Sequence, residues 1–199
     1  MANPHFSMIR RFGLADLLTL ANGACGVVAI FAAMKFRADG DAAHMLIAAV
    51  LIPLAFVFDV LDGKVARWRH TSSPLGRELD SLADVISFGV APAAIAFAAG
   101  LDTVLDQILL VFFALCGLSR LARYNVTAES LSGSAGKVRY FEGTPIPTSV
   151  VPLGILLLLF VRGDLYPGNV FGFGFHLPVL LFCASGCLMI SKTLRIPKF

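Results

Sequence analysis

Charged side chains are scarce in this sequence: Asp, Glu, Lys and Arg together make up 15% of its 199 residues, and 57% of the residues are hydrophobic. A soluble domain of average composition has roughly 25% charged residues. This composition excludes an ordinary soluble domain and indicates that lipid is the solvent around most of the chain.

Cysteine and histidine are also few, and neither is arranged for metal binding. The four cysteines all fall within apolar runs, which indicates neither an extracellular disulfide framework nor a CxxC metal site and favours small apolar packing residues. The four histidines form no spaced cluster, so we assign them no chemistry. The net charge of +3 does not imply nucleic acid as a partner.

Internal repeats, low-complexity tracts and linkers long enough to separate domains are absent from the sequence. We therefore expect a single membrane domain over residues 1–199. The N-terminal segment lacks a small-residue cleavage site, and the first apolar run is long enough to cross a bilayer. This run is expected to remain in the mature protein and not to be removed as a signal peptide.

Apolar runs are what the sequence has in abundance. A transmembrane helix needs about 20 predominantly apolar residues, and six runs of roughly that length lie between charged or Gly/Pro-rich breaks. The fifth is short and contains Pro152, so we expect a kink there or an extension by the preceding turn. The sequence predicts an all-α, polytopic membrane protein with six transmembrane helices, at residues 14–34, 44–66, 79–100, 104–124, 147–162 and 171–191.

Lysine and arginine are unevenly distributed over this topology. Thirteen of the sixteen fall on one side, and Lys35, Arg37 and Arg162 fall on the other. The positive-inside rule then places both termini, and the loops around residues 67–78 and 125–146, in the cytoplasm. We expect a multi-pass protein of the cell (inner) membrane, whose basic face attracts anionic lipid head groups at about 1 kcal/mol per basic residue.

Four aspartates lie toward the cytoplasmic ends of the second and third predicted helices. Asp59 and Asp62 are three residues apart, and Asp80 and Asp84 are four apart, so each pair projects from one face of its helix. A hairpin can oppose these faces. An uncompensated carboxylate at mid-bilayer costs about 2.5–3.5 kcal/mol, so the charges need neutralisation. Oxygen ligands without nearby His or Cys favour two divalent cations, Mg²⁺ or Mn²⁺.

An alternative is that the four acids pair with nearby basic residues in a structural ion network. Such a network does not explain why Gly63 and Ala66 flank the acids, where they leave a helix face poor in side chains that a bulky ligand can approach. The basic residues available for a network are Lys64, Arg67, Arg69 and Arg77.

The spacing of these residues carries a resemblance to a known family. From Asp59 to Asp84 the sequence reads D-x2-D-G-x2-A-R-x8-G-x3-D-x3-D, which is similar to the signature of the CDP-alcohol phosphotransferases. Four further stretches resemble the branch of that family that uses serine as the acceptor alcohol: TLAN from Thr19, GRELDSLADVISFGVAPA from Gly76, SRLARYNV from Ser119 and FEGTPIPTS from Phe141.

The resemblance implies transfer of a phosphatidyl group from CDP-diacylglycerol to the hydroxyl of L-serine, with release of CMP. It implies two metal ions held by Asp59, Asp62, Asp80 and Asp84, with Asp84 also the candidate general base. It further implies a homodimer in the membrane. Contacts to the CDP portion are expected from Asn22, Asp62, Gly63, Ala66 and Arg67.

The carboxylate of a serine substrate needs a cation near the same cytoplasmic end of the helices. Arginine is suited to planar, bidentate capture of a carboxylate, so we expect Arg120 or Arg123 to bind it, with help from the amide of Asn125. The alternative interpretation of each arginine is an anchor for lipid head groups.

Two competing functions stay open from the sequence. A sibling enzyme would use a phosphorylated acceptor, glycerol phosphate or inositol phosphate, and would need more positive charge. A cation transporter or channel would use the intramembrane acids as its pathway. The acids cluster near one membrane face without polar residues of similar density beyond them, which argues against a path across the membrane.

Overall fold

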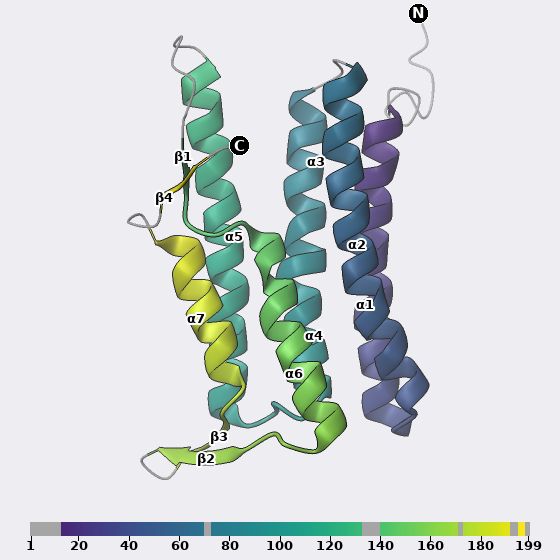
Figure 1. Cartoon of the computed structure of the whole chain (residues 1–199), viewed down its shortest axis with the longest axis vertical. Coiled ribbons are helices and arrows are strands. Elements are labelled where there is room, and N and C mark those ends of the chain that lie inside the picture. The colour runs from purple at the N-terminus through teal and green to yellow at the C-terminus, as the bar shows by residue number, and fades with distance from the viewer. Residues whose placement is uncertain (1–12, 70–72, 133–139, 171–172, 192–194, 198–199) are drawn as a thin grey trace, which may run out of the picture.

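The computed structural model describes residues 13–69, 73–132, 140–170, 173–191 and 195–197. The described chain is mostly helical, which confirms the helical class predicted from the sequence, and Figure 1 shows the helices side by side in a bundle. In chain order the elements are α1 (Leu14–Asp39), α2 (Ala42–Arg69), α3 (Pro74–Asp84), the π-helix η2 (Val85–Val90), α4 (Ala91–Ala98), α5 (Val104–Ser132), β1 (Tyr140–Glu142), the 3₁₀ helix η3 (Ile146–Ser149), α6 (Val150–Arg162), β2 (Pro167–Val170), β3 (Phe173–His176), α7 (Val179–Ile190) and β4 (Arg195–Pro197).

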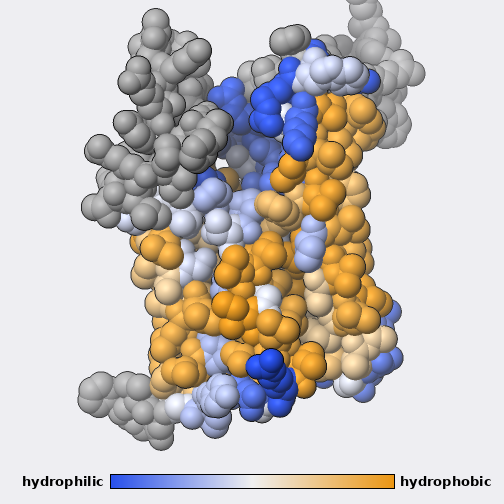
Figure 2. Space-filling view, in the orientation of Figure 1, coloured by the Kyte–Doolittle hydropathy of each residue, from blue (hydrophilic) through white to orange (hydrophobic). Residues whose placement is uncertain are grey.

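Four helical segments are long and apolar enough to cross a membrane: Leu14–Asp39, Ala42–Arg69, Leu75–Ala98 and Val104–Val126. Two apolar helices, Ile146–Arg162 and Val179–Ile190, are shorter. Hydrophobic side chains cover the middle of the face shown in Figure 2, and hydrophilic ones gather at its two ends. The structure therefore supports a membrane protein, with four helices of spanning length among the described residues.

The C-terminal helix corrects one expected boundary. A helix predicted over residues 171–191 begins instead at Val179, and the segment Phe173–His176 forms strand β3, paired antiparallel with β2. Pro178 stands immediately before the helix, where its fixed φ suits a helix start, and Gly174 weakens helix formation before it. The apolar composition of this segment concealed the change from strand to helix.

Two local signals set the start of α3. Ser73 precedes the helix in an extended conformation, and its Oγ accepts a hydrogen bond of 2.9 Å from the backbone N–H of Gly76. Pro74 occupies the first turn, where its missing N–H costs nothing. The third predicted helix, residues 79–100, therefore begins earlier than expected and continues through η2 and α4.

Small residues let α1 approach the third helical segment closely. A Cβ added to Gly26 of α1 would lie 2.6 Å from Ser87 Oγ of η2, and one added to Gly23 would lie 3.4 Å from the Cβ of Ala83. Side chains at these positions would push the helices apart. The backbones therefore pack in direct contact, which places the polar residues of α1 beside those of α3.

The second half of the bundle packs around α5. Phe113 of α5 meets Phe182 of α7 edge to face, with ring centroids 5.3 Å apart, and both rings are fully buried. A Cβ on Gly117 would lie 2.7 Å from Ile146 Cδ1 of η3. This contact holds the start of α6 against α5 at mid-height in the bundle, as Figure 1 shows.

Candidate metal and substrate site

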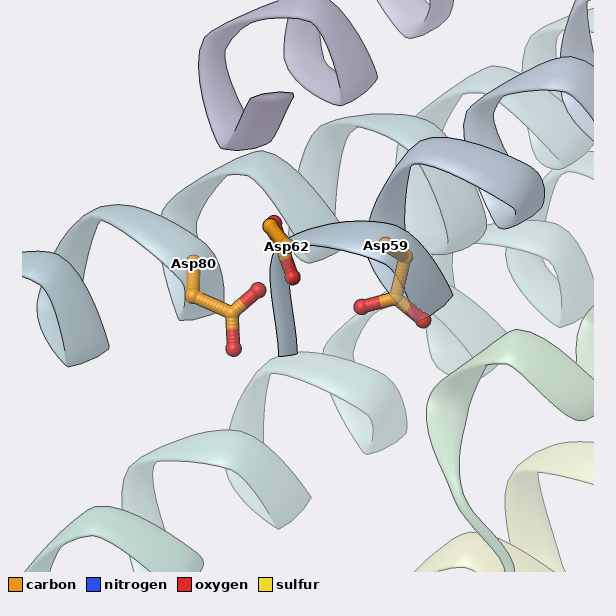
Figure 3. A group of neighbouring side chains, drawn as sticks. All are labelled: Asp59, Asp62 and Asp80. Atoms are coloured by element: carbon orange, nitrogen blue, oxygen red, sulfur yellow. The ribbon is translucent and has the colours of Figure 1, made fainter. Parts of the chain in front are cut away.

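Helices α2 and α3 bring three of the four predicted aspartates together. One carboxylate oxygen from each of Asp59, Asp62 and Asp80 lies within 4.8 Å of the other two. Figure 3 shows the three side chains converging, Asp59 and Asp62 from α2 and Asp80 from α3. The spacing of three on α2 and the opposed placement of α3 produce this convergence, as the sequence pattern suggested.

Asp84 lies one helical turn beyond Asp80 and is 7% exposed. Its Oδ1 accepts a hydrogen bond of 3.1 Å from Nδ2 of Asn22 on α1. Asp84 does not belong to the three-residue group whose oxygens lie within 4.8 Å of one another. The fourth acid therefore occupies its own environment, held by an amide of α1.

Helix α1 supplies a second contact that sequence reasoning missed. Thr19 Oγ1 donates to Asp62 Oδ2 at 2.6 Å, and Ser87 Oγ donates to the backbone carbonyl of Asn22 at 2.8 Å. Thr19 and Asn22 are three residues apart and both are buried. Two polar residues three apart inside an apolar run could have indicated that this face of α1 contacts the aspartates.

Two buried oxygen atoms near the aspartates have no hydrogen-bond partner in the described chain, Asp80 Oδ1 and Asn22 Oδ1. An unpaired buried polar atom costs free energy, and an unpaired buried charge costs more. Among the described residues Arg37 forms an ion pair with Asp102, and the imidazoles of His44 and His176 lie within 4.0 Å of Asp39 and Asp106. None joins an acid of the cluster to Lys64 or Arg67, so the alternative of a structural ion network finds no support here.

The donor set fits a hard divalent cation. Three carboxylates within 4.8 Å repel one another when ionised, and the cluster contains oxygen ligands alone. Mg²⁺, Mn²⁺ and Ca²⁺ bind such oxygen sets, whereas zinc sites favour sulfur and nitrogen. The cluster, together with the partnerless Asp80 Oδ1, can therefore hold a metal ion.

Four of the five residues expected to contact the CDP portion lie on α2, where they share one face with Asp59, and the fifth, Asn22, lies on α1. Positions 59, 62, 63, 66 and 67 follow the i, i+3, i+4, i+7, i+8 pattern of a single helical stripe. Gly63 and Ala66 are half-buried, and Arg67 is exposed at the polar end of the helix. Nη1 of Arg67 lies 3.6 Å from where a Cβ of Gly63 would be. The stripe therefore extends from the acid cluster to an arginine at the surface.

Gly76, which follows the eight variable residues after Arg67 in the signature, has a packing role. A Cβ on Gly76 would lie 2.9 Å from Asp16 Oδ1 and 3.1 Å from Ser73 Oγ. The first turns of α1 and α3 thus meet closely at this point. Gly76 helps to place Asp80 one turn further along α3.

The three residues expected to bind the serine carboxylate have different environments. Arg120 is 8% exposed, and its guanidinium lies 5.6 Å from the centre of the Tyr124 ring, with no hydrogen bond or ion pair to a described residue. Arg123 donates to the carbonyl of Ile190 at 3.5 Å. Arg120 therefore forms no hydrogen bond with a described residue, whereas Arg123 contacts the end of α7.

Asn125, the third of these residues, is bound to α3. Its Nδ2 donates to Ser81 Oγ at 3.0 Å and to Glu78 Oε2 at 3.3 Å, while its Oδ1 accepts from Ser81 at 3.2 Å. These contacts tie α5 to the helix that carries Asp80 and Asp84. The amide of Asn125, which was expected to help bind the serine carboxylate, is therefore already hydrogen-bonded to α3.

Comparison with known proteins places the chain in a family. A model of the family described as CDP-alcohol phosphatidyltransferase matches residues 12–189. The chain belongs to this family. A protein of Saccharomyces cerevisiae named CDP-diacylglycerol–serine O-phosphatidyltransferase is 46% identical over 98% of the chain and 74% of its own length.

Relatives with the same printed name occur in more distant organisms. The one from Methanocaldococcus jannaschii is 31% identical over 98% of the chain and 90% of its own length. The one from Bacillus subtilis is 31% identical over 92% of the chain and 89% of its own length. Similarity to serine-using members therefore extends over nearly the whole chain.

Proposed function

We propose that the chain transfers a phosphatidyl group from CDP-diacylglycerol to L-serine, which yields phosphatidylserine and CMP. The observation that carries this proposal is the convergence of Asp59, Asp62 and Asp80 at one end of an apolar bundle, with a buried oxygen left unpaired. A site of this kind suits a substrate with a charged pyrophosphate and a lipid tail. The names of the relatives support serine as the acceptor.

The metal centre is proposed to use all four aspartates and two ions, Mg²⁺ or Mn²⁺. Asp59, Asp62 and Asp80 form the converging group, and Asp84 lies one turn away on α3. When bound, divalent cations neutralise the pyrophosphate and stabilise the charge that develops on the departing CMP. The described chain places no basic side chain in an ion pair with these acids.

Asp84 is proposed as the general base. The serine hydroxyl forms the new bond to the phosphorus of the phosphatidyl group, the bond from that phosphorus to the CMP oxygen breaks, and the hydroxyl proton passes to Asp84. A hydroxyl is a weak nucleophile at neutral pH, so a carboxylate aimed at its proton contributes about 10²–10⁴-fold. The hydrogen bond from Asn22 orients Asp84 for this role.

The CDP portion is proposed to lie along the α2 stripe, with Asn22, Asp62, Gly63, Ala66 and Arg67 around it. Gly63 and Ala66 leave room for a nucleotide to approach the backbone, and Arg67 can bind a phosphate oxygen at the surface end. Asn22 is fully buried and its amide already binds Asp84. Its contribution is therefore proposed to come through its unpaired Oδ1.

Arg120 is the preferred residue for the serine carboxylate. The Arg120 guanidinium is 8% exposed and forms no hydrogen bond or ion pair with a described residue, so most of its water is lost and the Tyr124 ring replaces only part of it. A bound carboxylate would supply that compensation in the bidentate geometry that arginine favours. Arg123 and Asn125 stay in the proposal as weaker contributors, because each has contacts with neighbouring helices.

The membrane arrangement is also proposed. The segment Ile146–Arg162 and helix α7 would complete six transmembrane helices in one domain over residues 1–199, with both termini and the active site in the cytoplasm at the inner membrane. At 1.5 Å per residue the 12 residues of α7 cover about 18 Å, so flanking segments would complete that crossing. A homodimer, expected from the resemblance, is tested by the mass of the purified protein in detergent.

The acceptor test uses purified protein with CDP-diacylglycerol and Mn²⁺, and measures CMP release with serine, glycerol phosphate or inositol phosphate. Serine is expected to stimulate release, and the two phosphorylated alcohols are not. Stimulation by a phosphorylated acceptor in place of serine would assign the chain to a sibling activity. Metal flux into vesicles without turnover of CDP-diacylglycerol would favour the transporter.

A further inference from the structure

Helix α1 packs beside the four aspartates and forms a hydrogen bond with two of them. Thr19 is 3% exposed and Asn22 is fully buried, and their three-residue spacing puts them on one face. Thr19 binds Asp62 of α2, and Asn22 binds Asp84 of α3. Thr19 begins the TLAN stretch that resembles the serine-using branch, but neither the aspartate signature nor the predicted ligand set includes it.

The hydroxyl of Thr19 has one proton and two nearby acceptors. Asp62 Oδ2 lies 2.6 Å from Oγ1, and the carbonyl oxygen of Ala15, one turn earlier, lies 3.1 Å away. Hydrogen bonds to a carboxylate are shorter and roughly twice as strong as those between neutral groups. The proton therefore points to Asp62, and the Ala15 carbonyl is the secondary acceptor that helical threonines commonly use.

The packing of α1 does not depend on this hydrogen bond. Gly23 and Gly26 set the contact between α1 and α3–η2, with Ala83 and Ser87 opposite them. Valine has nearly the shape of threonine, so exchanging the hydroxyl for a methyl group preserves the volume at position 19. What the hydroxyl adds is the direction of the Asp62 carboxylate.

We propose that Thr19 is a positioning residue that fixes the Asp62 carboxylate for metal binding. This inference rests on the proposed metal centre. A carboxylate that binds a metal is itself commonly held by a hydrogen bond, and loss of that partner typically weakens metal affinity by about 10–100-fold. Thr19 occupies one oxygen of Asp62 from α1, which restricts rotation of the carboxylate beside Asp59 and Asp80.

The test measures Mn²⁺ binding to the full-length, metal-free protein in detergent by electron paramagnetic resonance of free Mn²⁺. The variants are T19V, which removes the donor, and T19S, which restores a hydroxyl. T148V is the matched control, because Thr148 also donates to a backbone carbonyl, that of Pro145 at 2.7 Å, but lies in η3. Thermal unfolding without metal checks that each variant is folded.

T19V is expected to raise the dissociation constant for Mn²⁺ by about 10–100-fold, while T19S and T148V stay close to wild type. At saturating Mn²⁺, the KM for CDP-diacylglycerol is expected to change little in T19V. Equal Mn²⁺ affinity in T19V and wild type, or a T19S variant as weak as T19V, overturns the inference and leaves the metal centre standing. Absence of Mn²⁺ binding by the wild type refutes the metal centre and this inference with it.

Discussion

Acids with little exposure lie at opposite ends of the bundle and differ in their hydrogen bonds: Asp106 at one end, and the group of four at the other, in which Asp62 and Asp84 are buried and Asp59 and Asp80 half-buried. At the end where α5 begins, Asp106 is fully buried and both of its oxygens are bonded. At the other end, neither Asp59 nor Asp80 accepts a hydrogen bond from a described residue, and Asp80 Oδ1 is buried without a partner. Figure 1 shows the separation, with the start of α5 and strand β3 far from the start of α3.

Asp106 is a structural acid in all of its contacts. Its Oδ2 accepts from the backbone and hydroxyl of Thr103, at 3.2 and 2.8 Å, before the first turn of α5. Its Oδ1 accepts from the backbone N–H of His176 at 2.9 Å, and the imidazole Nδ1 of His176 lies 2.7 Å from Oδ2. The carboxylate thus caps α5 and attaches the β2–β3 hairpin to it.

In this apolar chain, a functional acid differs from a structural one in how its oxygens are hydrogen-bonded. Burial is common to both ends, so burial alone does not discriminate. The hydrogen bonds of the carboxylate oxygens do discriminate. An acid that serves the fold is fully hydrogen-bonded, while an acid kept for a ligand retains free lone pairs at a cost in stability. Four substitutions test this difference, in order of decreasing expected effect.

The largest effect is expected from Asp84→Asn, which removes the proposed base and keeps the shape of the side chain. CMP release with serine should fall by about 10²–10⁴-fold, and some Mn²⁺ binding should remain through the three converging acids. Stopped assays of CMP formation at saturating substrates measure the loss. Retained turnover would contradict the assignment of the base and weaken the functional side of the comparison.

Arg120→Gln extends the comparison to a buried cation that forms no hydrogen bond or ion pair with a described residue. Loss of one partner of a buried charge pair costs about 2–5 kcal/mol, so the KM for serine should rise by at least roughly 30-fold, with a small change in the KM for CDP-diacylglycerol. Arg123→Gln is the matched control and should change the serine KM much less. Equal effects of the two variants would show that the environment of Arg120 among the described residues carries no information on the acceptor.

Asp80→Asn tests whether an acid of the cluster itself serves metal binding or the fold. Metal-free protein should unfold at the wild-type temperature or above, because the change removes repulsion with Asp59 and Asp62. Added Mn²⁺ should stabilise the wild type by about 2.7 kcal/mol at a hundred times its dissociation constant and should stabilise the variant far less. Thermal unfolding with and without Mn²⁺ measures both. A large metal-free destabilisation would make Asp80 a structural residue.

Asp106→Asn is expected to show the opposite behaviour. The amide nitrogen cannot accept the hydrogen bonds that one carboxylate oxygen now accepts, so the variant should lose about 1–3 kcal/mol of stability. Its Mn²⁺ affinity and its serine KM should match wild type when measured on folded protein at low temperature. A selective loss of activity at unchanged stability would break the distinction between the two ends.

Much of the site was predictable because helical spacing is a local property. The D-x2-D spacing placed Asp59 and Asp62 on one face, and the apolar runs on either side indicated helices. The contact between Thr19 and Asp62 spans 43 positions of sequence, and the one between His176 and Asp106 spans 70. Contacts between residues so far apart in the sequence leave no periodic signal. The residues around His176 therefore did not reveal that Asp106 is its structural partner.

Composition and residue spacing were enough to establish that the chain is helical, that it is apolar enough for a membrane and that four aspartates lie on two helix faces, because both act through the nearest turns of the chain. Long-range packing governs which three carboxylates converge, which amide holds Asp84, which buried arginine forms no hydrogen bond with a described residue and which buried acid serves the fold. These outcomes depend on how closely α1, α3 and α5 approach one another, and that distance is set by packing between residues far apart in the sequence.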